Sequence, residues 1–222
     1  MAREIRNLTP LCAIIDADAA ARAGWPLLDL AAAYLRGGAR FLQVRAKSMP
    51  GDAFLATAAA IVQLARRHGA RVVINDRADI ARLADADGVH VGQDDLSPGA
   101  IRAVVGTVSI VGLSTHTIEQ VDRAVGQPVC YLAIGPVFGT ATKATGYDAI
   151  GLGRVRDAAR RATARDLPLV AIGGITLDNA ASVLEAGAAS VAVISDLLAT
   201  GDPEGRVRAY LERLSRSEQP RV

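Results

Sequence analysis

The hydrophobic residues of this chain fall into short apolar runs, and these runs alternate with longer amphipathic segments. Several runs are continuous rather than alternating, which is typical of strands buried on both faces of a parallel sheet. The pattern predicts strands over Leu11–Ile15, Phe41–Val44, Val72–Asn75, Gly88–Val91, Ile110–Leu113, Val129–Ile134, Leu169–Ile172 and Ser190–Ile194. Each strand leads into a helical pattern, so a strand and a helix recur every ~20–30 residues.

The segments between the strands show helical periodicity and the residues that begin and end helices. Gly37-Gly38 and Gly69 stand where a helix must stop, and Ser97-Pro98 combines an N-cap with a proline at the first helical position. The predicted helices are Leu27–Arg36, Asp52–Arg67, Ile80–Ala86, Pro98–Val105, Ile118–Val125, Leu152–Thr163, Asp178–Ala186 and Pro203–Ser215.

Eight near-equal strand–helix units predict an α/β fold, a single (β/α)8 TIM barrel of parallel strands. An open, doubly wound sheet would share this alternation, but no Gly-x-Gly-x-x-Gly fingerprint follows the first strand. No linker or shift in composition divides the chain. Residues 1–222 are therefore expected to form one domain, with a polar tail over residues 216–222 that frays.

The composition supports a large aliphatic core and argues against two kinds of partner. Half of the 222 residues are hydrophobic and only 4% are aromatic, so the core is built from Ala, Val, Ile and Leu. The formal net charge is +2 without a long run of one sign, which argues against nucleic-acid binding. Glycine and proline interrupt the uncharged stretch 124–142, which argues against a membrane span.

The two cysteines, Cys12 and Cys130, both lie in apolar runs. They are interpreted as buried thiols that behave as small hydrophobic groups, which fits a reducing compartment. The first residues are polar and lack the apolar segment of a secretory signal. The sequence therefore predicts a cytoplasmic protein, and it leaves open whether copies associate into a homo-oligomer.

Polar residues gather directly after the predicted strands, and the carboxyl ends of barrel strands form the rim where such barrels keep their active sites. Asp76 and Asp95 follow the third and fourth strands and could hold one Mg²⁺ ion, although most aspartates in such loops cap helices or lie at the surface. Arg45, Lys47 and Lys143 supply the opposite charge, which points to a polyphosphate ligand or, more simply, to surface cations.

The loops after the last two strands are candidates for a second phosphate site. Gly173-Gly174-Ile175-Thr176 and Ile194-Ser195-Asp196 occupy the positions that often bind phosphate in these barrels, although glycine pairs also make ordinary tight turns. His116 follows the fifth strand, and no catalytic partner for it can be argued from the sequence. His68 and His90 are interpreted as structural residues.

Four of these segments, taken in order and spacing, resemble the thiamine phosphate synthase family, also called thiamine phosphate pyrophosphorylase. The resemblance extends over nearly the whole chain, from the second to the eighth strand. Any one segment alone is a modest signal, but the ordered set is highly specific. The segments are Gln43–Lys47, Asn75–Arg77, Gly88–Leu96 and Gly135–Lys143.

The resemblance implies an activity and a set of site residues. The family joins 4-amino-5-hydroxymethyl-2-methylpyrimidine diphosphate to a thiazole monophosphate, giving thiamine phosphate and diphosphate. By resemblance, Asp76 and Asp95 hold Mg²⁺, and Arg45, Lys47, Lys143 and Ser114 act in catalysis. The pyrimidine diphosphate is expected at Gln43, Arg45, Lys47, Asn75, Ser114 and Lys143, and the thiazole phosphate at Thr140, Ala141, Thr142, Gly174, Ile194 and Ser195.

Two segments of the chain depart from the pattern of the family. Gly139 stands where the family often has proline, and Ala144-Thr145-Gly146 stands where lysine and acidic residues are common.

One rival function is that of the metal-independent thiazole tautomerase, which shares the barrel and the histidine after the fifth strand, here His116. The other is a non-catalytic sensor of phosphorylated ligands. Both are disfavoured because the carboxylate and cation sets are complete.

Overall fold

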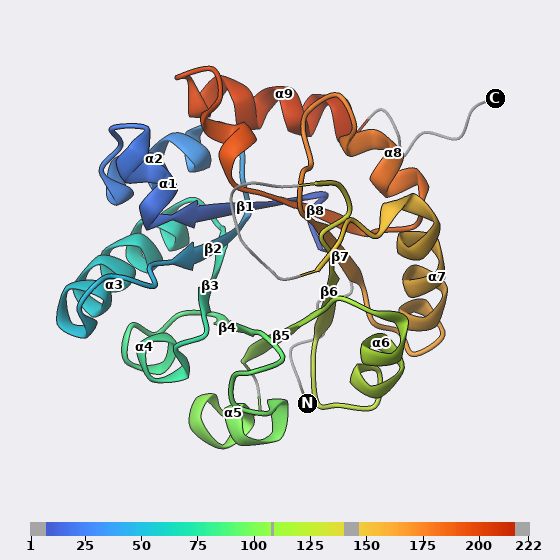
Figure 1. Ribbon diagram of the computed structural model, residues 1–222. Helices are drawn as coiled ribbons and strands as arrows, with labels where there is room; N and C mark the ends of the chain where they lie inside the picture. Colours follow the sequence, from blue (N-terminus) through green and yellow to red (C-terminus); the bar gives the residue numbers. More distant parts are fainter. Residues whose placement is uncertain (1–7, 108, 140–146, 216–222) are drawn as a thin grey trace.

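The computed structural model describes residues 8–107, 109–139 and 147–215 of the chain. Its strands form a closed barrel in chain order, and each neighbouring pair is parallel, with β8 closing against β1. Figure 1 looks along the barrel, with the helices arranged around the strands. The strands are β1 (Leu11–Asp16), β2 (Phe41–Arg45), β3 (Arg71–Asn75), β4 (Gly88–Val91), β5 (Ile110–Thr115), β6 (Tyr131–Ile134), β7 (Leu169–Ile172) and β8 (Ser190–Val193).

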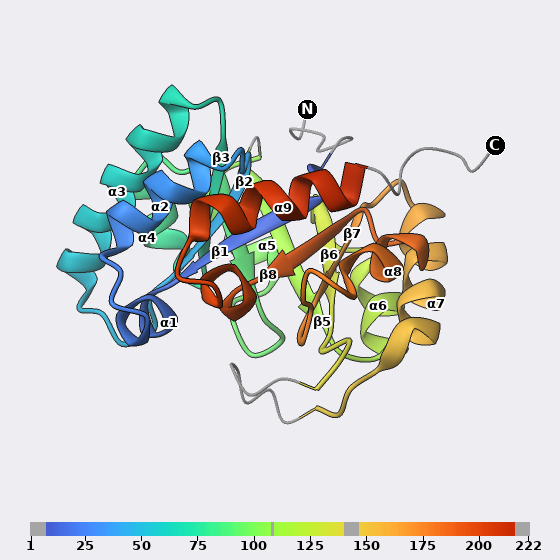
Figure 2. The same ribbon diagram turned by 90° about the horizontal axis from the view of Figure 1, so that it is seen from above.

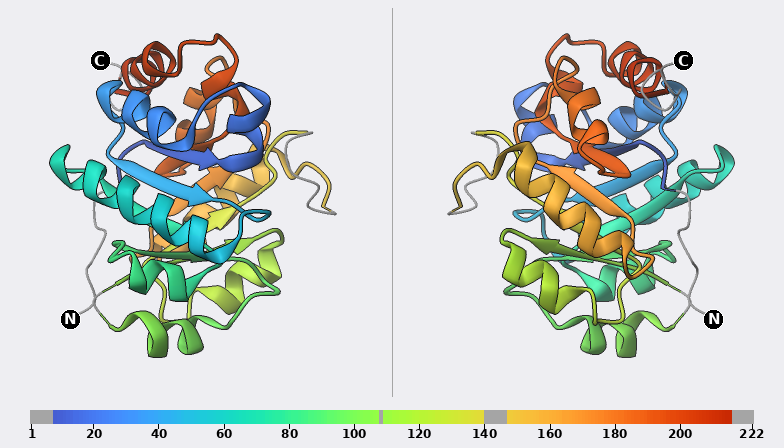
Figure 3. Two further views of the ribbon diagram at one scale, coloured as in Figure 1. Left: turned by 90° about the vertical axis from the view of Figure 1, so that its left-hand side faces the viewer. Right: turned by 90° about the vertical axis from the view of Figure 1, so that its right-hand side faces the viewer.

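Helices follow the strands and cover the outside of the barrel, as the side views show (Figure 3). Their buried stripes are rich in alanine, which allows a helix to lie close to the strands. The helices are α1 (Ala17–Arg22), α2 (Leu27–Arg36), α3 (Gly51–Arg67), α4 (Ala78–Leu83), α5 (Pro98–Val105), α6 (Ile118–Ala124), α7 (Gly151–Thr163), α8 (Ala180–Glu185) and α9 (Pro203–Ser215), with a 3-10 turn η1 (Ser195–Leu198).

The predicted barrel and its strand–helix units are confirmed, and the differences are two short elements that were not predicted and shifts at the ends of others. The sequence did not predict α1, a short helix that begins directly after β1 because the carboxylate of Asp16 accepts a hydrogen bond from the backbone N–H of Ala19. The turn η1 was also missed. The predicted helix Asp178–Ala186 begins at Ala180 instead, because Asn179 Oδ1 accepts a hydrogen bond from the N–H of Thr176 in a preceding turn.

Two apolar layers stabilise the barrel. The outer layer lies between strands and helices and is aliphatic, with Tyr34 and Tyr210 among the few buried rings. The inner layer fills the barrel axis and holds Cys12, Phe41 and Tyr131 among its members. Gly112 on β5 leaves room for the Tyr131 ring, since a Cβ at this position would lie only 2.1 Å from Tyr131 Cζ.

The carboxyl ends of all eight strands meet at one rim, and α1 lies at this same end of the molecule (Figure 2). The predicted frayed tail over residues 216–222 lies outside the described residues. Within the described residues, no helix is long and apolar enough to cross a membrane.

Candidate active site

A cavity of about 660 Å³ opens at the carboxyl-end rim of the barrel. The structure brings most of the sequence-predicted site residues to its wall, although they come from six different strands and their loops. Those that line the cavity are Gln43, Arg45, Lys47, Asn75, Asp76, Asp95, Ser114, Gly174, Ile194 and Ser195. The remaining four, Thr140, Ala141, Thr142 and Lys143, lie outside the described residues, as does the departure from the family pattern at residues 144–146.

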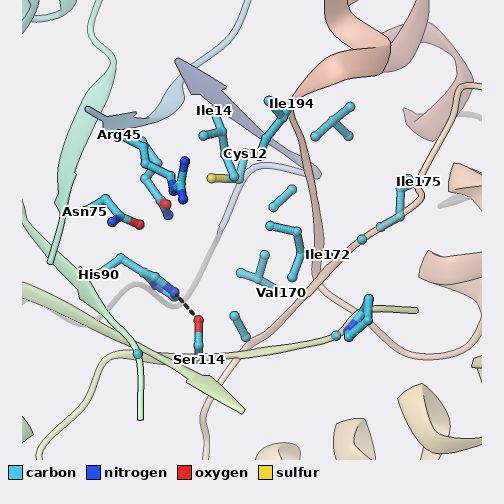
Figure 4. Close-up of a pocket in the computed structure, with 18 of the residues that line it drawn as sticks. Cys12, Ile14, Arg45, Asn75, His90, Ser114, Val170, Ile172, Ile175 and Ile194 are labelled. Carbon is cyan, nitrogen blue, oxygen red and sulfur yellow. Dashed lines mark hydrogen bonds between the residues drawn. The ribbon is translucent and has the colours of Figure 1, made fainter. Parts of the chain in front are cut away.

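The cavity has a polar wall and an apolar wall that face each other (Figure 4). The polar wall comes from the ends of β2 to β5, and the apolar wall comes from β7, β8 and the loops that follow them. This division suits a ligand with a charged group on one side and a flat organic ring against the other. The labelled polar residues are Arg45, Asn75, His90 and Ser114, and the labelled apolar residues across from them are Val170, Ile172, Ile175 and Ile194.

Arg45 is held at the rim by a buried carboxylate. It ends β2 beside Asp16, its registered partner at the end of β1. The Asp16 carboxylate accepts a hydrogen bond from Arg45 Nη1, and 15% of the Arg45 side chain is exposed against 4% for Asp16. A cation that is largely withdrawn from water needs such a partner, because an unpaired buried charge is costly.

Lys47 and Asp76 form a second ion pair across the polar wall. Lys47 Nζ lies 3.1 Å from Asp76 Oδ2, and both side chains retain contact with solvent. The Asp76 backbone has a φ of +62°, a left-handed conformation that aspartate and asparagine tolerate better than most residues. Its N–H donates to the carbonyl of His90, so the turn after β3 is fixed against β4 and aims the carboxylate into the cavity.

The carboxylate of Asp95 lies at the next loop of the same cavity, where its Oδ2 accepts a hydrogen bond of 2.7 Å from the N–H of Gly92. Among the described residues, Oδ1 of Asp76 and Oδ1 of Asp95 each accept no hydrogen bond. The two carboxylates thus each have an oxygen available, and they lie beside the amides of Asn75 and Gln93. This donor set fits Mg²⁺, which binds few protein carboxylates and retains several of its water ligands. Larger groups of His, Cys, Asp and Glu suited to a metal do not occur in the described part of the chain.

His90 points into the cavity, although the sequence reading treated it as a structural residue of the fourth strand (Figure 4). Its Nε2 lies 2.8 Å from the hydroxyl of Ser114, and its Nδ1 lies 2.8 Å from the hydroxyl of Tyr131. Burial raises the pKa of Tyr131 well above its ordinary value, so this hydroxyl keeps its proton. The chain of three polar groups fixes the direction of the Ser114 hydroxyl at the cavity wall.

Cys12 is buried in the inner layer and borders the floor of the cavity. Burial raises the pKa of its thiol to about 12. The side chain is therefore a neutral thiol at ordinary pH and serves as part of the apolar floor rather than as a nucleophile. Cys130 is also a free, buried cysteine, so the interpretation of both as buried thiols is confirmed.

The loops after β7 and β8 are tied to each other and to α9. Gly174 has a φ of +64°, and its carbonyl accepts a hydrogen bond of 3.1 Å from Asn179 Nδ2. In η1, Asp196 accepts hydrogen bonds from the guanidinium of Arg206 and, at 2.6 Å, from the hydroxyl of Tyr210. These contacts hold the backbone of both loops at the apolar side of the cavity.

His116 lies at the edge of the cavity and contacts the backbone of β6. Its Nδ1 lies 2.6 Å from the carbonyl oxygen of Gly135, and because a carbonyl only accepts, this nitrogen carries the proton. The imidazole also stacks on the ring of Tyr147 at 4.1 Å between centroids. Both contacts orient the ring at the rim.

The sequence pattern indicated most residues that face the cavity, but it did not indicate the residues that hold them in place. Asp16, His90 and Tyr131 were not assigned to the site. A buried aspartate at the end of an apolar run was a usable signal for Asp16, since such a charge requires a partner. The sequence carried no comparable signal for Tyr131, whose role depends on its contact with His90 from another strand.

Comparison with known proteins agrees with this geometry. A family model described as thiamine monophosphate synthase matches residues 11–197. The thiamine-phosphate synthase of Roseiflexus castenholzii is 44% identical over 186 residues, which cover 84% of this chain and 80% of the relative. That of Koribacter versatilis is 44% identical over 210 residues, which cover 94% of this chain and 97% of the relative.

A solved structure, the thiamine phosphate pyrophosphorylase from Pyrococcus furiosus, has a TM-score of 0.87 to this chain at 29% identity. The alignment covers 97% of this chain and 100% of that structure. The family match begins at the first residue of β1 and ends within η1, so it includes every strand of the barrel and every described residue of the cavity wall named above. The chain belongs to the thiamine monophosphate synthase family.

Proposed function

We propose that this chain is a thiamine phosphate synthase, a transferase of thiamine biosynthesis. It condenses 4-amino-5-hydroxymethyl-2-methylpyrimidine diphosphate with 4-methyl-5-(2-phosphooxyethyl)thiazole, and the products are thiamine phosphate and diphosphate. The observation that carries the proposal is the rim cavity, in which cations and carboxylates on one wall face an apolar wall and a glycine loop on the other.

The polar wall supplies what a leaving diphosphate requires. Arg45 offers a planar set of N–H donors and Lys47 a compact charge, and both stabilise negative charge as it grows on the departing oxygens. The C–O bond at the pyrimidine methylene breaks first, and the electron-rich aminopyrimidine stabilises the resulting cation. The thiazole nitrogen then attacks that carbon, so the reaction needs neither an enzymic nucleophile nor a strong base.

Asp76 and Asp95 are the residues that would hold Mg²⁺. A divalent cation bound there supplies further positive charge to the diphosphate. In the structure Asp76 Oδ2 is paired with Lys47 Nζ. Holding Mg²⁺ at Asp76 would weaken this ion pair and would leave Lys47 able to turn to the diphosphate.

The other residues of the proposed site orient the two rings. Gln43, Asn75 and Ser114 present amide and hydroxyl groups to the pyrimidine diphosphate, and Ser114 is directed by His90. Gly174, Ile194 and Ser195 seat the thiazole phosphate beside the apolar wall. Thr140, Ala141, Thr142 and Lys143 complete the proposed site. Two free cysteines and phosphorylated substrates support a cytoplasmic location.

The decisive experiment is product formation from the two substrates with Mg²⁺, followed by mass spectrometry. Thiamine phosphate should appear only when both substrates and the metal are present, and a chelator should abolish it. A thiazole tautomerase would instead move a proton on the thiazole phosphate without using the diphosphate, and a sensor would bind ligands without turnover. Absence of thiamine phosphate from folded protein at saturating substrates would reject the proposal.

A further inference from the structure

We propose that Asp16 is a positioning residue for Arg45, which it holds in the orientation that receives a diphosphate. The inference rests on the proposed function, since it assumes that Arg45 binds this group. Asp16 is not part of the cavity wall, whereas Arg45 is, so Asp16 acts from behind its partner. The two residues end neighbouring strands in direct register, which places both side chains at the same point of the rim.

The Asp16 carboxylate is fixed through both of its oxygens. Oδ1 accepts a hydrogen bond of 2.9 Å from the N–H of Ala19 in the first turn of α1, and Oδ2 accepts one from Arg45 Nη1. Only 3% of Asp16 is exposed. The Asp16 carboxylate is thus fixed in place by the backbone of α1, and it contacts Arg45 at the end of β2.

This contact engages one nitrogen, Nη1, of the Arg45 guanidinium. The group carries five N–H donors in one plane, so holding Nη1 restricts the orientation of the whole plane. Arg45 Nε is buried and has no hydrogen-bond partner among the described residues. The ion pair with Asp16 is the contact that orients the side chain before a ligand arrives.

Helix capping alone does not account for an aspartate at this position. Serine or asparagine would cap α1 equally well without a charge. A negative charge behind a phosphate-binding arginine lowers the local positive potential, which by itself weakens the binding of an anion. The carboxylate is useful to anion binding only if the orientation that it imposes on Arg45 outweighs this electrostatic cost.

The inference is therefore tested by whether removing the Asp16 charge weakens or strengthens the binding of diphosphate. The variants Asp16→Asn and Asp16→Ser both keep an oxygen that can cap α1, and both remove the charge that faces Arg45. Binding of inorganic diphosphate is measured by calorimetry in metal-free buffer. If Asp16 positions Arg45, the affinity falls about three- to tenfold in both variants. A rise in affinity, as charge removal alone predicts, would overturn the inference.

A double-mutant cycle shows whether the effect passes through Arg45. In the Arg45→Gln background, Asp16→Asn should no longer weaken diphosphate binding, because no guanidinium remains to be oriented. An equal loss in both backgrounds would contradict the inference and point to general damage at the rim. Asp122→Asn is the matched control, since it breaks an Asp–Arg pair with Arg161 on the outer helices and should leave the affinity unchanged.

The binding assay also separates this inference from the proposed function. A wild-type chain that shows the Asp16–Arg45 coupling toward diphosphate but forms no thiamine phosphate would reject the function and keep the positioning role. A chain that forms thiamine phosphate without the coupling would keep the function and reject the role of Asp16. Circular dichroism on each variant establishes that the barrel is intact.

Discussion

The two cations of the polar wall in the described part of the chain are each held by a carboxylate before any ligand binds. Arg45 is paired with Asp16 from behind, and Lys47 is paired with Asp76 across the cavity. The two pairs differ in solvent contact, since 15% of the Arg45 side chain is exposed and 53% of the Lys47 side chain. The Lys47 pair is therefore the easier one for a ligand to exchange, because exposed ion pairs are weak.

At the residue scale, Asp76→Asn should lower turnover about 10²–10³-fold, because the amide loses the charge proposed to hold Mg²⁺ near the leaving group. Asparagine tolerates the left-handed backbone at this position, so the fold should be kept. The measurement is steady-state kinetics at limiting Mg²⁺, with circular dichroism as a check on the fold.

The matched control for that variant is Asp85→Asn. Asp85 also has a positive φ, of +53°, but it lies at the surface and pairs with Arg66 away from the cavity. Its substitution should leave turnover unchanged. Wild-type turnover of Asp76→Asn at limiting Mg²⁺ would remove Asp76 from the proposed metal site.

A second residue-scale prediction concerns the reactivity of Cys12. Since burial raises its pKa to about 12, the fraction of thiolate at pH 8 is very small and labelling by iodoacetamide should be slow in the native protein. The rate should rise with pH toward 12, because deprotonation creates the nucleophile. Mass spectrometry of peptides from native and denatured protein gives the comparison. Rapid labelling of native Cys12 at pH 8 would show that the floor of the cavity is accessible and polar.

At the element scale, the loop after β7 has a tight geometry around Gly174. A Cβ on this residue would lie 2.5 Å from the carbonyl oxygen of Gly139 and 2.7 Å from Phe138 Cβ. A substitution here displaces the loop after β6 and would also block the approach of the phosphate that is proposed to bind there. The loops after β6 and β7 therefore act together at the apolar side of the cavity.

Gly174→Ala is expected to raise the Michaelis constant for the thiazole phosphate roughly tenfold, ~1.4 kcal/mol, and more than that for the pyrimidine diphosphate. The control is Gly69→Ala, since Gly69 has the same φ of +64° but a Cβ there would meet nothing within 4 Å. The control variant experiences the same backbone strain without the steric clash. Kinetics with each substrate varied in turn can separate the two effects, and an equal rise for both substrates would count against a dedicated phosphate site.

At the scale of the whole molecule, the inner layer of the barrel limits how deep the cavity can reach. Tyr131 fills the axis beside Gly112 and packs edge-on against Phe41 at 5.8 Å between ring centroids. It also borders the cavity, where its hydroxyl contacts His90. The Tyr131 side chain therefore contributes both to the packing of the barrel and to the geometry of the site. The prediction that residues 1–222 form one domain remains a prediction, and it agrees with a barrel closed by β1 and β8.

Gly112→Ala should lower the free energy of unfolding by about 1–3 kcal/mol, because the added methyl group forces the Tyr131 ring out of place. It should also lower activity, since Tyr131 contacts His90. Chemical denaturation checks the first effect, and Gly99→Ala in α5 is the control because its Cβ would meet nothing within 4 Å. Unchanged stability of Gly112→Ala would mean that the barrel axis is loosely packed.

The sequence alone determined the architecture and most of the residues that face the cavity. Apolar runs such as Leu169–Ile172 can be identified as strands because a buried parallel strand needs hydrophobic side chains on both faces. Polar residues such as Asp76 and Asp95 follow the strands directly, and a closed parallel barrel must bring all these ends to one rim. Local pattern and topology are therefore sufficient to predict that these residues meet.

Only the tertiary structure decided which residues support them. Asp16 pairs with Arg45 across 29 positions of sequence, His90 links Ser114 to Tyr131 from three different strands, and a Cβ on Gly174 would clash with the loop after β6. These contacts depend on strand register and on distances of a few ångströms, which no periodicity encodes. The physical reason is that a hydrophobic pattern fixes which face of an element is buried, whereas hydrogen bonds and steric contacts are set when the elements come together.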